Sequence, residues 1–322
     1  MGFFSRLIRK KGTPPVVAPL HPQVDFPHYE AVEQDRFTRP LSTKKSHIIV
    51  FANEKGGVGK STTAFHTCVA LCNAGEKVAA LDIDLRQLTL DRALNARMES
   101  AREYGLDLPG PRQILLTQST EAELETKIRM AQIDCTFIVI DVGGHDSPIA
   151  RRAISMANTI VTPVNDSFID LDMLGRIDPR TGDLRTLGAF ARLVGHLKEP
   201  GLAQRAKALD WVVMQNRSRS QATKNERKVT DALNKIAPVA GFRLIPGLRE
   251  RVIYRELFPI GLTLFDLKLI PNLGRPQPAA KAEIASMLKS LNLPAGLGAS
   301  ADALSAPKSD QHRIDRLKPP VS

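Results

Sequence analysis

A glycine-rich segment between an apolar run and a helix-like stretch constrains the fold of this chain most. Residues 53–62 read NEKGGVGKST; the run HIIVFA (47–52) precedes them and the pattern STTAFHTCVALCNAG (61–75) follows. The run is rich in β-branched residues, which is typical of a strand buried on both faces, and Gly75 is suited to end the helix. A strand, a glycine-rich loop and a helix in this order predict a loop that binds phosphate groups.

This loop departs from the usual phosphate-loop pattern at its first position. Gly-x-x-x-x-Gly-Lys-Ser/Thr requires a glycine where the chain has Glu54, and Lys55 is an extra basic residue upstream of the expected Lys60. The remaining glycines still allow backbone N–H groups to turn inward around an anion, and the helix that begins at Lys60 adds its positive end. A dinucleotide-binding fingerprint is excluded, because no third glycine follows at the required spacing.

We predict that the loop binds ATP together with Mg²⁺. Lys60 supplies a mobile positive charge for the β- and γ-phosphates, and Ser61 supplies a hydroxyl for the metal ion. The loop residues predicted to contact the nucleotide are Gly56, Gly57, Val58, Gly59, Lys60, Ser61 and Thr62.

Further apolar runs, most of them separated by helical patterns, follow along the chain. They are KVAALDID (77–84), CTFIVIDV (135–142), NTIVTPV (158–164), DWVVMQN (210–216) and FRLIPG (242–247). Buried strands that alternate with helices are the signature of a doubly wound, mostly parallel sheet flanked by helices. We therefore expect one α/β domain of the P-loop NTPase type over residues 45–292.

The two ends of the chain differ from this domain in composition. Residues 1–44 form a basic, proline-rich extension and residues 293–322 a polar tail, and both are expected to be disordered. In residues 1–12, MGFFSRLIRKKG, a helix would carry apolar side chains on one face with basic side chains beside them. This segment could be a short amphipathic membrane anchor. The alternative is a disordered tail or one that docks on a partner. No run of about 20 apolar residues is present, which excludes a membrane-spanning helix.

The charge balance favours a polyanionic partner. The chain has 45 Lys and Arg against 34 Asp and Glu, which gives a net charge of +11 and suits nucleic acid or an anionic membrane surface. Cys68, Cys72 and Cys135 do not form a disulfide framework, and we expect them to be buried small side chains in a reducing cytoplasm.

Aspartates end two of the predicted strands, where a doubly wound sheet binds its ligands. Asp141 stands where a carboxylate would hold Mg²⁺ through water, and alternation sends Asp82 and Asp84 to the same side of their strand. One of this pair can orient a water for attack on the γ-phosphate. The alternative role for Asp84 is to cap the next helix.

The segment KGGVGKST (55–62) resembles the deviant Walker A motif of the ParA/MinD family of P-loop ATPases. The resemblance implies that Lys55 reaches across an ATP-bound homodimer to the phosphates of the other subunit. The segment DVGGHDS (141–147) departs from the Asp-Thr-Pro-Gly common in the switch loop of this family, although Gly144 still permits the turn. By the same resemblance the catalytic residues are Lys55, Lys60 and Asp84, the metal-binding residues are Ser61, Asp82 and Asp141, and the adenine contacts are Asn216 and Arg217.

A narrower resemblance is to the MipZ group within this family. It rests on DIDLRQLT (82–89), where the general family has Asp-Pro-Gln, and on residues 161–179, 210–217 and 241–267, within a similarity over roughly 46–292. It implies a slowly hydrolysing, ATP-dependent homodimer that binds double-stranded DNA without sequence preference, interacts with ParB and inhibits polymerisation of FtsZ. Such a protein is expected in the cytoplasm, on the nucleoid and near the cell poles. A ParA-type partitioning ATPase and a membrane-targeted scaffold related to MinD are the alternatives.

The basic stretch NRSRSQATKNERK (216–228) is predicted to open a helix and to form part of a DNA-binding face. Contacts with phosphates alone give binding that is sensitive to salt and neutral to sequence; a solvated basic helix face is the alternative. Of the two histidines near the loops, His66 is expected to pack inside its helix and His145 to lie in the switch-like segment. The residues assigned to DNA are Arg217, Arg219, Lys224, Arg227 and Lys228.

Overall fold

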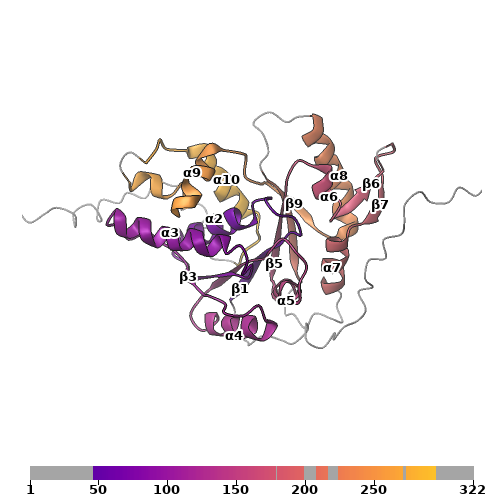
Figure 1. The fold of residues 1–322 in the computed structure, drawn as a ribbon. Coiled ribbons are helices and arrows are strands. Elements are labelled where there is room, and N and C mark those ends of the chain that lie inside the picture. The colour runs from indigo at the N-terminus through magenta and orange to yellow at the C-terminus, as the bar shows by residue number, and fades with distance from the viewer. Residues whose placement is uncertain (1–45, 179, 199–207, 217–223, 271–272, 295–322) are drawn as a thin grey trace, which may run out of the picture. The chain divides into compact units, whose positions relative to one another are not determined.

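Seven parallel strands form the central sheet of the computed structural model, which describes residues 46–178, 180–198, 208–216, 224–270 and 273–294 (Figure 1). Neighbouring strands follow the order β3–β2–β4–β1–β5–β8–β9. This arrangement confirms the predicted doubly wound sheet. The strands are β1 (His47–Phe51), β2 (Val78–Asp82), β3 (Arg112–Gln113), β4 (Phe137–Asp141), β5 (Thr159–Val164), β8 (Asp210–Gln215) and β9 (Arg243–Ile245).

Helices cover both faces of this sheet (Figure 1). One face is covered by α4 (Glu121–Ala131), α5 (Pro148–Met156), α7 (Ala189–Lys198) and α8 (Lys224–Ala240). The other is covered by α2 (Lys60–Asn73), α3 (Thr89–Glu103), α9 (Val252–Leu257) and α10 (Pro278–Lys289).

The two apolar cores follow from alternation along buried strands. In β1, Ile48 and Val50 belong to the core under α4 and α5, whereas Ile49 and Phe51 belong to the core under α2 and α3. Because successive side chains of a strand point to opposite faces, a strand with helices on both sides must be apolar at every position. This requirement explains why the strands could be recognised as continuous apolar runs.

The register of the strands brings the predicted functional segments to one edge. Phe51, the last residue of β1, pairs with Asp141, and Asp82 pairs with Asp141 from the other side. Since all these strands are parallel, their carboxyl ends meet at the same edge of the sheet. The glycine-rich loop that follows β1 therefore lies beside both aspartates.

A two-stranded antiparallel hairpin lies outside the sheet and was not predicted. It consists of β6 (Gly175–Ile177) and β7 (Leu184–Leu187), and its register shifts between Arg176 and Ile177. Strands this short carry too few residues for alternation to be recognised, and the same is true of the two-residue β3.

The cysteines, the two ends of the chain and the absence of a membrane-spanning helix were also predicted. Cys68 and Cys135 are buried as predicted, and Cys72 is partly exposed. The extension 1–44 and all but the first two residues of the tail 293–322 lie outside the described residues, so the domain boundaries stay predictions. Within the described ranges, no helix is both long and apolar enough to cross a membrane.

Candidate functional site

The glycine-rich loop between β1 and α2 contains two glycines in the left-handed backbone conformation. Gly57 has φ 75°, and Gly59, with φ 93°, stands directly before α2. A Cβ atom at Gly59 would lie 2.3 Å from Nδ2 of Asn216, so a side chain there has no room. The same Asn216 amide donates a hydrogen bond to the carbonyl oxygen of Val58 at 3.0 Å. Asn216 thus supports the loop, and its contact with adenine stays a prediction.

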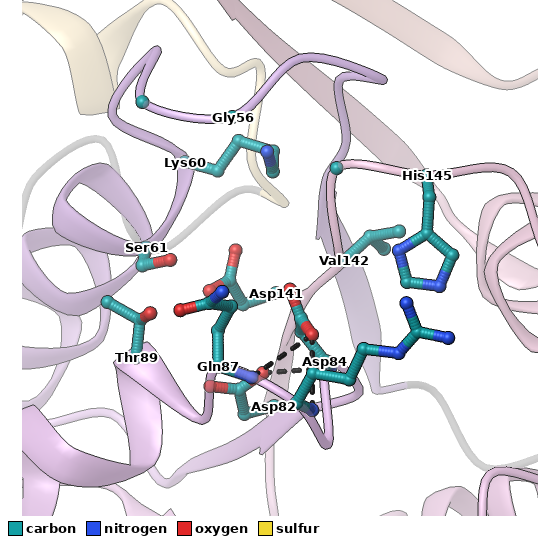
Figure 2. A pocket seen from close by; sticks show the side chains of 13 residues that line it. Gly56, Lys60, Ser61, Asp82, Asp84, Gln87, Thr89, Asp141, Val142 and His145 are labelled. Carbon is teal, nitrogen blue, oxygen red and sulfur yellow. Dashed lines mark hydrogen bonds between the residues drawn. The ribbon is translucent and has the colours of Figure 1, made fainter.

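The loop forms one wall of a cavity of about 460 Å³. Lys60 and Ser61, at the beginning of α2, face side chains that come from the ends of β2 and β4 (Figure 2). Asp82, Asp84 and Asp141 all line the cavity, so the predicted carboxylates and the loop meet in one site. A loop rich in N–H donors opposite several carboxylates suits a triphosphate that is held together with Mg²⁺.

Lys60 is buried beside its own loop. Its Nζ donates a hydrogen bond to the carbonyl oxygen of Lys55 at 2.8 Å. Burial lowers the pKa of Lys60, although the negative charges of Asp141 and Asp84 oppose this shift. The ammonium group therefore lies against its own loop and lines the cavity, and its contact with phosphate stays a prediction. Thr62, in the first turn of α2, does not line the cavity.

Asp141 ends β4 as a fully buried carboxylate. Burial raises its pKa to about 8; the negative charge of Asp82 adds to the shift, and a hydrogen bond with Ser61 opposes it. Among the described residues, the buried Oδ1 of Asp141 has no hydrogen-bond partner. An orphaned carboxylate oxygen beside a hydroxyl fits a Mg²⁺ ion or its bound water.

A magnesium ion at this position would need ligands besides protein side chains. In the part of the chain that the structure describes, no three His, Cys, Asp or Glu side chains are grouped to hold a metal ion. Mg²⁺ commonly keeps several waters and binds one or two carboxylates together with phosphate oxygens. The donor set of Ser61 and Asp141 fits that mode of binding.

Asp82 and Asp84 organise the chain between β2 and α3. Asp82 accepts hydrogen bonds from the backbone N–H groups of Asp84 (3.0 Å), Leu90 (2.9 Å) and Asp91 (3.4 Å), so it stabilises the beginning of α3. Burial raises the pKa of Asp82 to about 6, although these hydrogen bonds oppose the shift. Asp84 accepts from the N–H of Arg86 at 3.3 Å. The helix-capping role considered for Asp84 therefore belongs to Asp82.

Lys55 does not line the cavity, because its side chain is bound elsewhere. Its Nζ forms an ion pair with Asp170, in the short helix α6 (Phe168–Leu171). The Asp170 side chain is 0% exposed and that of Lys55 43% exposed. The other carboxylate oxygen of Asp170 accepts a hydrogen bond from the N–H of Asn165 at 3.3 Å. Within one subunit, the extra lysine of the loop is thus held by a buried carboxylate that the sequence did not reveal.

The switch-like segment after Asp141 passes between the phosphate loop and Asp84. A Cβ atom at Gly144 would lie 3.2 Å from the backbone nitrogen of Gly56, and one at Gly143 would lie 3.1 Å from Oδ2 of Asp84. Glycine at both positions permits this close approach, and the chain bends at Gly144, where a turn was predicted. His145 follows and lines the cavity.

The residues assigned to DNA are only partly described. Arg217 and Arg219 lie outside the described residues, and of Lys224 only the backbone, at the start of α8, is described. Arg227 and Lys228 are exposed on α8 and do not line the cavity. The helix that the basic stretch was predicted to open is confirmed from Lys224 onward, whereas its contact with DNA stays a prediction.

Known proteins share parts of this sequence. The protein ParA of Rhizobium radiobacter is 30% identical over 124 residues, which are 38% of this chain and 50% of that protein. The cytosolic Fe–S cluster assembly factor nubp2 of Xenopus tropicalis is 44% identical over 57 residues, 18% of this chain and 21% of that factor. This chain therefore spans half or less of the length of these two curated relatives.

Solved structures share the fold at low sequence identity. Apo McdA from Cyanothece has a TM-score of 0.55 and 18% identity, covering 76% of this chain and 99% of McdA. MinD from Pyrococcus horikoshii, solved with Mg-ADP, has a TM-score of 0.51 and 19% identity, covering 78% of this chain and 98% of MinD. The family model described as ATPase MipZ matches residues 47–295, a span that contains the sheet, the phosphate loop and the three aspartates. The chain belongs to the MipZ family of ATPases.

Proposed function

We propose that this protein is an ATP-dependent dimerisation switch that regulates placement of the division site. Membership of the MipZ family supports the ATPase activity. The observation that carries the switch is the ion pair of Lys55 with Asp170, beside a cavity lined by the groups proposed here to bind phosphate and Mg²⁺. Because the Lys55 side chain is 43% exposed, a second subunit can reach it and compete with Asp170 for its charge.

Within one subunit the side chains have separate roles. The glycine N–H groups and Lys60 bind the phosphates, and Ser61 and Asp141 are the residues that would hold Mg²⁺, with Asp82 as a supporting carboxylate. When bound, Mg²⁺ neutralises charge on the phosphate oxygens. Asp84 orients the attacking water, because a carboxylate is a weak base near neutral pH and contributes mainly by positioning.

Pairing of two subunits completes the site in this proposal. A bound triphosphate attracts Lys55 of the partner subunit more strongly than Asp170 does, because it carries several negative charges. Lys55 then neutralises charge on the phosphates in the manner of an arginine finger supplied in trans. Without the γ-phosphate the two basic surfaces repel each other. Turnover is slow and regulatory, since the complete site exists only in the pair.

The partners follow from the family and from charge. The ATP-bound dimer binds double-stranded DNA without sequence preference through Arg217, Arg219, Lys224, Arg227 and Lys228, doubled across the dimer. The net charge of +11 supports such binding. The monomer associates with ParB near the cell pole, and the dimer on the nucleoid inhibits FtsZ polymerisation. A ParA-type partitioning ATPase is the second candidate, supported by the 30% identity to a ParA protein.

Polymer mass of purified FtsZ separates the two candidates. With saturating ATP and Mg²⁺, the Asp84→Ala protein, which retains ATP, should lower the mass of FtsZ polymer recovered by sedimentation. The Lys60→Ala protein should leave it unchanged, because it does not hold the nucleotide. If neither protein changes the polymer mass while DNA retention still depends on ATP, the partitioning ATPase is the better assignment.

A further inference from the structure

Arg86 lines the cavity proposed to bind the nucleotide, and its positive charge is not paired with a carboxylate among the described residues. Its side chain is exposed and lines the 460 Å³ cavity together with Asp84 and His145. The same three residues line a smaller neighbouring cavity of about 180 Å³. Among the described residues, the guanidinium of Arg86 forms no ion pair or hydrogen bond. It is therefore available to a bound ligand.

The backbone holds Arg86 at this position through Asp84. Oδ1 of Asp84 accepts hydrogen bonds from the N–H groups of Arg86 and Gln87, both at 3.3 Å. The carbonyl oxygen of Asp84 accepts from the N–H of Leu88 at 2.8 Å, which closes a tight turn before α3. Asp82 fixes the beginning of that helix. The turn thus holds Arg86 two residues after Asp84, the carboxylate proposed to orient the attacking water.

The charges in the cavity leave room for another cation. Three carboxylates, Asp82, Asp84 and Asp141, line the cavity, and a triphosphate brings further negative charge. Lys60 faces them from the same subunit and a bound Mg²⁺ would add two positive charges, which together do not offset the carboxylates and the triphosphate, whereas Lys55 is bound to Asp170. A guanidinium carries a planar set of donors that matches two phosphate oxygens at once. Arg86 can supply the missing positive charge without a second subunit.

We propose that Arg86 binds the terminal phosphate of ATP in its own subunit and thereby distinguishes ATP from ADP. The proposal rests on the ATP-binding function proposed above. It differs from the role of Lys55, which acts across the dimer. Because Asp84 accepts a hydrogen bond from the Arg86 backbone, the same contact would link recognition of the γ-phosphate to the position of the catalytic carboxylate.

The test uses nucleotide affinity in a protein that cannot pair. In the Lys55→Ala background, the dissociation constants of Mg-ATPγS and Mg-ADP are measured by calorimetry, with and without Arg86→Gln. Arg86→Gln should weaken the affinity for ATPγS by about tenfold or more, as expected for loss of a hydrogen bond between charged groups. The affinity for ADP should change by less than about twofold. Arg86→Lys should restore part of the difference, since it keeps the charge without the planar donors.

Arg92→Gln is the matched control, because Arg92 is exposed on α3 and does not line either cavity. It should leave both affinities unchanged. An unchanged ratio of ATPγS to ADP affinity in Arg86→Gln would overturn the proposal, and so would an equal loss of both affinities with a lower melting temperature. If the Lys55→Ala parent binds neither nucleotide, the proposed function itself fails, which is a distinct result.

Discussion

The buried charges around Arg97 and those around Asp141 differ in how completely their hydrogen bonds are satisfied. Arg97, on α3, donates to both carboxylate oxygens of Asp266 (2.8 and 3.0 Å), to the carbonyl oxygen of Gly261 (3.1 Å) and twice to that of Pro109 (2.8 and 3.1 Å). These bonds use all five donors of a guanidinium. Asp266 also accepts from the N–H and the hydroxyl of Thr263.

The charges around Asp141 are less well matched. Oδ1 of Asp141 has no partner among the described residues, its pKa is raised, and burial lowers the pKa of Lys60 opposite. A buried polar group without a partner is costly, and an ion or a water at a binding site is one way in which the partner is supplied. The Arg97 cluster joins α3 to the segment around Asp266 and so stabilises the fold, whereas the poorly matched charges around Asp141 fit the proposed role in binding nucleotide and Mg²⁺.

Breaking the Arg97 cluster should have the largest effect on stability. Arg97→Met leaves Asp266 buried without its cation, which is expected to cost about 3–5 kcal/mol of unfolding free energy. Denaturant unfolding of the nucleotide-free protein measures this loss. Arg92→Met, at an exposed position of the same helix, is the control and should change stability by less than about 0.5 kcal/mol. Equal effects of the two substitutions would show that the buried cluster contributes little.

Asp141→Asn should separate binding from folding. The amide keeps the size of the carboxyl group, and the pKa of about 8 already keeps that group largely protonated at neutral pH without nucleotide. The free energy of unfolding of the nucleotide-free protein should therefore change little. Affinity for ATP in the presence of Mg²⁺ should fall by about 10- to 100-fold, because a ligand to the metal ion is weakened. Calorimetry with and without Mg²⁺ measures the difference. A loss of stability as large as that of Arg97→Met would contradict the assignment.

His66 offers a pH-dependent test of a third buried group, next to the Arg97 cluster. It is fully buried, its ring lies 5.0 Å from that of Tyr254, and burial lowers its pKa to about 4 from 6.5. Between these values the unfolded chain binds a proton that the folded chain does not. Stability should therefore fall as the pH falls through this window, by about 1.4 kcal/mol per pH unit.

His66→Leu should remove this contribution to the pH dependence. Thermal unfolding of the nucleotide-free protein at a series of pH values compares the two slopes. A slope in the variant equal to that of the unchanged protein would show that another group is responsible for the acid sensitivity.

Asp170→Asn should have the smallest effect. It removes the negative charge that holds Lys55 in its own subunit, while the amide oxygen can still accept from Asn165. Since Lys55 is partly exposed, the ion pair is worth roughly 0.2–1 kcal/mol, and ATP-driven pairing should become up to about fivefold tighter. Sedimentation equilibrium measures the pairing constant. Weaker pairing in Asp170→Asn would indicate that Asp170 itself belongs to the interface.

The sequence predicted the elements that have local signals. Continuous apolar runs located the long strands, and the glycines with Lys60 and Ser61 located the phosphate loop. The strand ends located Asp82 and Asp141, and the structure brings these groups together. The period of two also placed Asp82 and Asp84 on one side, although it could not reveal that Asp82 binds the N–H groups that begin α3.

The groups that the sequence did not predict depend on distant parts of the chain. Lys55 and Asp170 are 115 residues apart, and Arg97 and Asp266 are 169 residues apart. Such pairs form only because the sheet and its helices bring the two segments together. No local sequence pattern around either residue indicates which distant residue it contacts. Arg86 is present in DIDLRQLT, but only the structure shows that its side chain lines the cavity.

Molecular mass in solution tests the switch most directly. The Asp84→Ala protein, in which we expect hydrolysis to be blocked, is examined by analytical ultracentrifugation with Mg-ATP, with Mg-ADP and without nucleotide. We predict twice the single-chain mass with Mg-ATP alone, and a single-chain mass once Lys55→Ala is added. A protein that stays single at saturating ATP and Mg²⁺, or that pairs equally well with ADP, would contradict the account.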